Sequence, residues 1–270
     1  MEHISRADDP RVADYRRLND TAYRRNFEAP GPFHKGLFIV EGWLAVERLG
    51  RSRYPARSVL VDAAKLDRVA EQLPHLRCAV YAAPREVLDE IVGFALHRGI
   101  VASAERGLAV VARSVIGRGR NLVVCEGIND AENLGVIVRN AAALGGDGLL
   151  LDPTSCDPLA RRTIRVSVGW ALTVPHARLP LPAGLGELHD AGVTTVALTP
   201  RADSLDMDDI VARGVPDRVA LVLGAEGPGL SDATIDGCRY AVRIPMARGV
   251  DSLNVAAAAA IAMHRLFTLR

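Results

Sequence analysis

The sequence predicts an α/β protein whose mainly parallel sheet is covered by helices on both faces. Apolar runs of four to seven residues alternate with helical patterns along the chain, which is typical of this class. Several runs, such as residues 148–152 and 218–224, are almost continuously apolar, as expected for strands buried on both faces. The 270 residues, 49% of them hydrophobic, are enough for one large domain or two modest ones. This composition argues against a disordered or fibrous protein.

The first half of the chain is expected to form a small α/β unit. Its strands are predicted at residues 37–40, 59–61, 78–83 and 99–104, and its helices at 43–50, about 66–73 and 85–93. Residues 112–120 then interrupt the alternation with two glycines and three arginines, which indicates a linker. We therefore divide the chain into domains 1–115 and 116–270.

A second α/β unit follows the linker. Its strands are predicted at residues 121–127, 148–152, 194–199, 218–224 and 240–245. Its helices are predicted at residues 133–144, 158–166, 184–191, 231–237 and 252–268.

Charge and cysteine content exclude several classes of protein. The 33 basic and 32 acidic residues leave a net charge of +1, so bulk charge indicates neither a nucleic-acid nor a membrane partner. The four cysteines lie far apart without zinc-ligand spacing, so we expect small buried side chains and no metal. The longest apolar stretch, residues 255–263, is too short to span a bilayer. With no leader-like N-terminus, we expect a reducing, cytoplasmic location and no membrane.

Three segments of the second unit are candidates for chemistry. The first, residues 131–146, begins a helix that Asn133 could cap, and Arg139 lies beside its apolar stripe. Arg139 is either a snorkelling side chain or a functional one. The second, LVLGAEGPGLS at 221–231, runs from a buried strand through three glycines to a helix capped by Ser231. It fits neither of the two common nucleotide-loop patterns, and it is either a tight turn or a ligand loop at the carboxyl end of a strand.

The third segment, RIPMARGVDSLNVAAAAAIAMHRL at 243–266, places a polar loop between a strand and an alanine-rich helix. Asp251 or Ser252 could cap that helix. Its small side chains indicate close packing within the domain or against another chain.

Together the three segments resemble the ordered motifs of the SpoU (TrmH) branch of the SPOUT RNA methyltransferases. The matching patterns are N-L-G-x-I-x-R-x-A-A-x-x-G, L-V-L-G-x-E-G-x-G-L-S and I-P-M-x-x-x-V-D-S-L-N-V-A-x-A. The resemblance is strong over residues 121–270. In the first half it is weaker, where FIVEGWLAVERL and HRGIVASAERG are similar to the ribosomal-protein-like substrate-binding domain of many members.

The resemblance implies an α/β fold with a C-terminal trefoil-knotted SPOUT methyltransferase domain and a smaller N-terminal substrate-binding domain. It also implies a homodimer packed through the knotted domain, S-adenosylmethionine as cofactor, and methylation of a ribose 2′-hydroxyl in rRNA or tRNA. The positions that would bind the cofactor lie in the three loops that the family uses: Leu198, Thr199, Gly224, Glu226, Gly227, Ile244, Met246 and Leu253.

The residues carried over as catalytic are Arg139, Asn133, Glu226, Ser252 and Asn254. Because a guanidinium stays protonated in proteins, we expect Arg139 to anchor the target phosphate and steady the oxyanion rather than act as base. It is expected to reach the partner chain's site. Glu226 would orient partner groups or hold the loop, while Ser252 and Asn254 would fix the ribose and the carboxylate end of the cofactor. Ala131 and Ala256 replace a Pro and a Ser that are common in the family.

The sequence is also compatible with two other functions. The chain could be a catalytically silent RNA- or ribosome-binding assembly factor on the same fold, or a base-methylating SPOUT enzyme. Arg161, Arg162 and Arg165 either bind RNA phosphates or form a solvated helix face. Residues 1–115 carry 18 basic and 15 acidic side chains against 15 and 17 in the remainder, which favours the first domain as the one that grips RNA.

Overall fold

The computed structural model describes residues 1–28 and 36–267, and these residues form two compact α/β units. The first unit comprises residues 1–109 together with 159–173, and the second comprises 110–158 together with 174–270. The predicted boundary at 115/116 therefore lies inside the second unit. Residues 159–173, which we expected in the second domain, belong to the first.

The first unit is built on a five-stranded mixed sheet in the order β1-β4-β3-β5-β2. β5 runs antiparallel to β2 and β3, and the other neighbours are parallel. Its strands are β1 (Glu2–His3), β2 (Leu37–Glu41), β3 (Ala56–Asp62), β4 (Ala79–Ala83) and β5 (Ile100–Glu105). Its helices are η1 (Pro10–Tyr15), α1 (Thr21–Glu28), α2 (Trp43–Gly50), η2 (Ala63–Lys65), α3 (Asp67–Gln72), α4 (Arg85–Val92), α7 (Arg161–Val166) and η3 (Trp170–Leu172).

The segment 159–173 belongs to the first unit because it packs against a strand and a helix of that unit. α7 lies against β2, and η3 lies against α2. Gly169 has a φ of 85°, and a Cβ there would lie 2.7 Å from the Cα of Ala45, so only glycine allows this approach. The guanidinium of Arg48 stacks on the ring of Trp170 at 4.3 Å.

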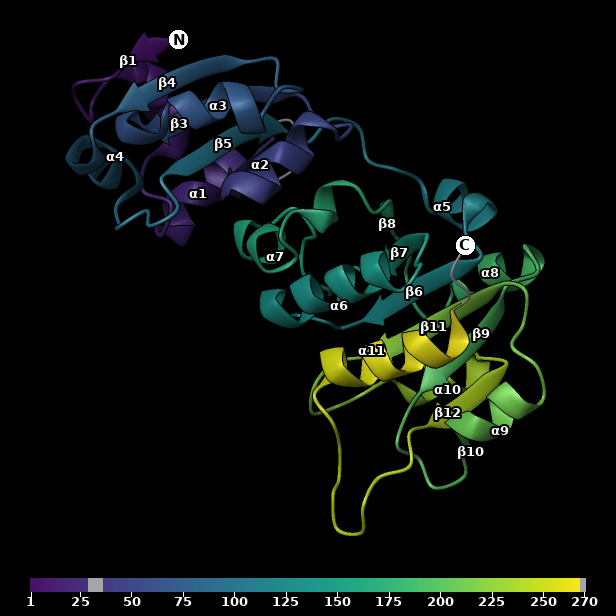
Figure 1. Cartoon of the computed structure of the whole chain (residues 1–270). Coiled ribbons are helices and arrows are strands. Elements are labelled where there is room, and N and C mark those ends of the chain that lie inside the picture. Colours follow the sequence, from purple (N-terminus) through teal and green to yellow (C-terminus); the bar gives the residue numbers. More distant parts are fainter. Residues whose placement is uncertain (29–35, 268–270) are drawn as a thin grey trace. The chain divides into compact units, whose positions relative to one another are not determined.

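The second unit is a seven-stranded, fully parallel sheet in the order β10-β12-β9-β11-β6-β7-β8 (Figure 1). Its strands are β6 (Asn121–Glu126), β7 (Gly148–Leu151), β8 (His176–Arg178), β9 (Thr194–Leu198), β10 (Leu205–Asp206), β11 (Val219–Gly224) and β12 (Tyr240–Arg243). Its helices are α5 (Ala112–Arg118), α6 (Ala131–Ala143), α8 (Leu185–Asp190), α9 (Met207–Ala212), α10 (Asp232–Gly237) and α11 (Val255–Leu266). Residue 268, the expected end of the last helix, lies outside the described residues.

Helices cover both faces of this sheet, as the apolar runs predict. On one face Val115 and Ile116 of α5 and Leu188 of α8 share a core with Leu122 and Val124 of β6. The alternate residues of β6, Val123 and Cys125, point to the opposite face because strand side chains alternate. On that face α11 packs on β11 and lies beside α6 (Figure 1). Residues 112–120 were expected to be a linker, but residues 112–118 form α5, which is held on the sheet by the buried Val115 and Ile116.

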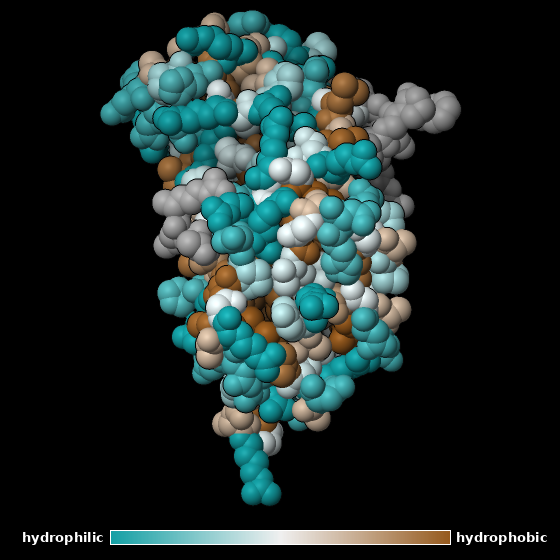
Figure 2. All heavy atoms as spheres, turned by 90° about the vertical axis from the view of Figure 1, so that its right-hand side faces the viewer, coloured by the Kyte–Doolittle hydropathy of each residue, from teal (hydrophilic) through white to brown (hydrophobic). Residues whose placement is uncertain are grey.

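The surface of the second unit leaves several large apolar side chains exposed. They are Val111 before α5, Val136 on α6, Ile261 on α11, and Val250 and Leu253 in the loop before α11. Over the face shown in Figure 2, hydrophobic and hydrophilic residues are interspersed. The loop from β12 to α11 extends away from the sheet (Figure 1).

Candidate functional site

A pocket of about 380 Å³ lies at the carboxyl edge of the seven-stranded sheet. Three loops enclose it: the segment after β9, the segment after β11, and the long connection from β12 to α11. This is where parallel sheets bind ligands, because the loops that follow neighbouring strands converge there. The pocket is lined by Leu198, Thr199, Pro200, Leu223, Gly224, Ala225, Glu226, Gly227, Gly229, Ile244, Met246, Ser252, Leu253, Asn254, Val255 and Ala258.

The loop after β11 is folded tightly and needs glycine at the last position of the strand, Gly224. A Cβ on Gly224 would lie 2.2 Å from the backbone nitrogen of Leu230. The loop closes through a hydrogen bond from Gly229 N to Ala225 O of 3.0 Å, and Gly227 has a φ of 87°. The sequence allowed this loop to be either a tight turn or a ligand loop. In the structure it is a tight turn that also forms a wall of the pocket.

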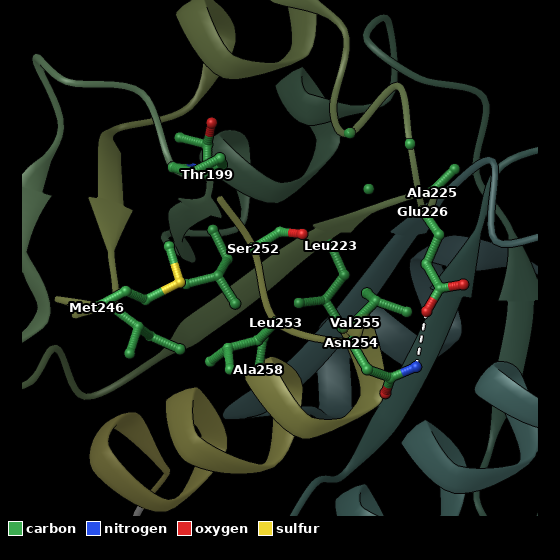
Figure 3. A pocket seen from close by; sticks show the side chains of 16 residues that line it. Thr199, Leu223, Ala225, Glu226, Met246, Ser252, Leu253, Asn254, Val255 and Ala258 are labelled. Atoms are coloured by element: carbon green, nitrogen blue, oxygen red, sulfur yellow. Dashed lines mark hydrogen bonds between the residues drawn. The ribbon is translucent and has the colours of Figure 1, made fainter. Parts of the chain in front are cut away.

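Asn254 joins the three motif segments at one end of the pocket. Its Nδ2 donates to Glu226 Oε1 at 2.6 Å, which connects the N-cap of α11 to the loop after β11 (Figure 3). The same nitrogen donates to Asn133 Oδ1 of α6 at 2.9 Å. Its Oδ1 accepts from the backbone nitrogens of Ala256 and Ala257 at 3.0 and 3.2 Å, so Asn254 also caps α11. Thr199 and Met246 lie on the opposite side of the pocket in this view (Figure 3).

Two predicted helix caps are wrong. α11 begins after Asn254, not after Asp251 or Ser252. α6 is capped by Asp130, whose carboxylate accepts from the backbone nitrogens of Glu132 and Asn133 at 2.6 and 3.4 Å. Because Asp130 supplies the cap, the Asn133 side chain is left to accept the bond from Asn254. The predicted cap at Ser231 is confirmed by its acceptance of Thr234 N.

The structure brings together most, but not all, of the residues selected from the sequence. All eight positions assigned to the cofactor line the pocket. Glu226, Ser252 and Asn254 also line it, and Asn133 is hydrogen-bonded to Asn254. Arg139 does not line the pocket. Arg139 is exposed on α6, about 9 Å along the helix axis from Asn133 and on a different face.

One residue that holds the pocket loop was not selected from the sequence. Glu126, at the end of β6, accepts hydrogen bonds from Ser231 N, Ser231 Oγ and Thr234 Oγ1 at 2.9, 2.8 and 2.7 Å. It therefore ties the C-terminal end of the loop after β11 to a neighbouring strand. The available signal was a carboxylate that ends the strand NLVVCE directly after four apolar residues.

A second carboxylate organises the loops after β6 and β7. Burial alone would raise the pKa of Asp152, but hydrogen bonds from Ser155, Thr154 and the backbone of Gly127 lower it overall. Ser155 Oγ donates to Asp152 at 2.6 Å, and Ile128 N donates to that same hydroxyl at 3.0 Å. The carboxylate is therefore a structural anion that joins the two loops.

Arg161, one of three arginines with two possible roles, is used inside the first unit. It donates to Glu41 at 3.2 Å and to Asn19 at 2.8 Å, and stacks on Phe94 at 5.0 Å. These contacts anchor α7 to β2, so Arg161 belongs neither to a solvated face nor to an open phosphate site. Arg162 is exposed and Arg165 is half-buried.

The described residues contain no cluster of three or more His, Cys, Asp or Glu side chains that could hold a metal ion. Burial raises the pKa of the Cys125 thiol to about 12 and that of Cys238 to about 11. Both thiols therefore stay protonated at neutral pH and are weak nucleophiles. Cys125 is buried as expected, whereas Cys78, Cys156 and Cys238 are only half-buried. No helix in the described ranges is long and apolar enough to cross a bilayer.

The parallel sheet, the glycine loop and the bridged pocket define an α/β protein with a ligand-sized pocket between three carboxyl-edge loops. The model of the SpoU rRNA Methylase family matches residues 120–264, which include all three motif segments. The chain belongs to this family of RNA methyltransferases.

Similar proteins agree with this assignment. An uncharacterized tRNA/rRNA methyltransferase of Mycobacterium tuberculosis is 38% identical over 265 residues, which cover 98% of this chain and 91% of the relative. The 23S rRNA (guanosine-2'-O-)-methyltransferase RlmB of Bordetella pertussis is 32% identical over 236 residues, or 84% of this chain and 95% of the relative. The AdoMet-bound rRNA methyltransferase from Sinorhizobium meliloti has the same fold, with a TM-score of 0.79, 24% identity, and coverage of 98% and 96% of the two chains.

Proposed function

We propose that this protein transfers a methyl group from S-adenosylmethionine to a ribose 2′-hydroxyl of rRNA or tRNA in the cytoplasm. The observation that carries the proposal is the Asn254 bridge, which joins residues of all three motif segments at one end of a ligand-sized pocket. The similarity to RlmB, described as a guanosine-2'-O-methyltransferase, supports ribose as the acceptor. The AdoMet-bound structural neighbour supports the cofactor.

The residues that line the pocket suit S-adenosylmethionine. The volume of about 380 Å³ lies within the usual range of small-molecule sites. Apolar surface for an adenine ring is offered by Leu198, Leu223 and Leu253. The loop after β11 offers backbone groups for the polar atoms of the cofactor. When bound, the cofactor supplies an electrophilic methyl group on a sulfonium. The role of the chain is to hold the pocket walls and orient the incoming hydroxyl.

We assign the acceptor side to the Asn254 bridge and to Arg139. Asn254 and Glu226 fix the end of the pocket, and the exposed Ser252 offers a hydroxyl there for the ribose or the cofactor carboxylate. Arg139 binds the phosphate beside the target ribose and stabilises the developing oxyanion, because its guanidinium keeps its charge.

The site is completed, in this proposal, by a second copy of the chain. Arg139 is exposed on α6, away from its own pocket. Large apolar side chains are also exposed on the two helices: Val136 on α6, three residues before Arg139, and Ile261 on α11. We assign these helices to a homodimer contact that carries Arg139 to the partner's pocket. The trefoil knot belongs to the same proposal.

Purified protein should bind S-adenosylmethionine in calorimetry and label RNA from a strain that lacks it. Alkali-resistant 2′-O-methylated positions, mapped in wild-type and deletion strains, identify the nucleotide. Arg139→Ala should abolish labelling while leaving the fold and cofactor affinity intact. Cofactor binding without RNA labelling would indicate an assembly factor, and alkali-sensitive labelled product would indicate base methylation.

A further inference from the structure

The first unit carries a cluster of cations around one tryptophan, here called the Trp43 patch: Trp43, Lys65, Arg68 and Arg98. Sequence separation hides it, because its members come from the start of α2, the η2–α3 region and the turn before β5. The sheet brings them together. Val61 of β3 pairs with Ile100 of β5, and Glu41 of β2 pairs with Val101, so the ends of β2 and β3 meet the start of β5.

Direct contacts hold the members of the patch in place. Trp43 Nε1 donates to the backbone oxygen of Arg98 at 3.0 Å, which fixes the indole ring. The guanidinium of Arg68 stacks on that ring, 4.4 Å from its centroid. Lys65 Nζ donates to the same Arg98 oxygen at 3.3 Å. The Arg98 side chain lies over Gly42, where an added Cβ would be 2.6 Å from its guanidinium nitrogen.

The charges of this patch are not neutralised by the protein. Elsewhere in the unit, Arg51 pairs with Glu47, and Arg57 pairs with Asp14 and Glu105. Within the described residues, the side chains of Lys65, Arg68 and Arg98 form no ion pair with a carboxylate. The nearby carboxylate of Asp62 instead accepts from Ala64 N and faces Arg85.

We propose that the Trp43 patch binds a single-stranded segment of the RNA substrate, with its cations on phosphates and the Arg68–Trp43 stack against a base. Unpaired bases stack on aromatic rings and on arginine planes, and a cationic groove follows the backbone. A duplex would keep its bases stacked inside and would leave the aromatic surface unused. This inference rests on the proposed function, because it specifies how that enzyme holds its RNA.

The test uses the full chain and a fluorescein-labelled 20-nucleotide oligouridine as probe. A triple variant, Lys65→Gln, Arg68→Gln and Arg98→Gln, should weaken binding at least ten-fold at low salt. The slope of log affinity against log salt should fall by about two, since each single-strand phosphate contact contributes about 0.7. Trp43→Ala should weaken binding roughly five-fold or more, while Trp43→Phe should keep most of the affinity.

The matched control is Arg51→Gln with Arg57→Gln, which removes two cations of the same unit that are paired with carboxylates. It should bind the probe like wild type. All variants should bind S-adenosylmethionine normally, because the pocket belongs to the other unit. In methylation assays the triple variant should raise the KM for RNA and leave kcat largely unchanged.

The outcomes separate this inference from the proposed function. Wild-type protein that neither binds the cofactor nor methylates RNA refutes the function. Wild-type protein that methylates RNA, with unchanged probe affinity and KM in the triple variant, refutes the patch. A labelled 20-base-pair RNA duplex that binds as tightly, with equal sensitivity to Trp43→Ala, refutes the single-stranded assignment.

Discussion

Replacing Asn254 with serine or alanine separates the two roles that this side chain performs. Serine can still cap α11 but cannot donate to Asn133 and Glu226, whereas alanine can do neither. Loss of a cap costs about 1 kcal/mol. The two bridging bonds are exposed, so we assign about 1 kcal/mol to both together, at the low end for hydrogen bonds.

The free energy of unfolding should therefore fall by about 1 kcal/mol in Asn254→Ser and about 2 kcal/mol in Asn254→Ala. For a unit of this size each kcal/mol lowers Tm by about 2–4 °C, which thermal unfolding followed by circular dichroism resolves. Both variants release Glu226, so both should lose roughly five- to ten-fold in S-adenosylmethionine affinity by calorimetry. A serine variant with wild-type Tm and wild-type cofactor affinity would refute the idea that this bridge organises the pocket.

Three further results are expected. Glu126→Gln should weaken cofactor binding several-fold with little loss of stability, because glutamine keeps the side-chain size and one carbonyl oxygen and changes only the bonds to Ser231, which ends the loop after β11, and to Thr234 of α10; unchanged affinity in calorimetry would contradict this. If Arg139 serves the partner's pocket, Arg139→Ala and Asn254→Ala chains, refolded as a 1:1 mixture and assayed at a subsaturating cofactor concentration, should reach about a quarter of wild-type methylation, since half the dimers would hold one intact site of two; only about half of the activity of Asn254→Ala alone would place Arg139 in its own subunit's site. The pKa of Asp152 is lowered in the folded state, so the carboxylate contributes fully to stability above its unfolded pKa, and this contribution is lost as pH falls through the lower folded pKa. In urea titrations, the loss of unfolding free energy in Asp152→Asn relative to wild type should therefore shrink toward acidic pH. A loss that stays constant with pH would contradict this coupling of stability to the ionisation of Asp152.

Strand positions could be predicted from the sequence because most buried strands are built around a short apolar run. Residues 121–126 and 219–224 match the predicted strands closely. The linker prediction failed because two glycines outweighed Val115 and Ile116, whose burial requires the sheet to be known. Short elements such as β8 and α9 carry too few residues for a clear period.

The pocket residues were located by motif, but their mutual geometry was not predictable. That Asn254 rather than Ser252 caps α11 depends on where the loop from β12 ends. Glu126 was missed because it acts on Ser231, 105 positions away in sequence. Such pairings become visible only when the strands are placed in order.

The membership of residues 159–173 in the first unit affects how this protein can be divided or recombined. The chain passes between the units after Ala109, Pro158 and Thr173, so each unit is discontinuous in sequence. A single crossover near residue 110 between two related sequences would join the N-terminal segment of one parent to the α7 of the other. The residues that replace Arg161 would then have to match Glu41 and Asn19 of the first parent. Recombination at one point is therefore constrained, and the two halves of the chain are expected to be inherited together.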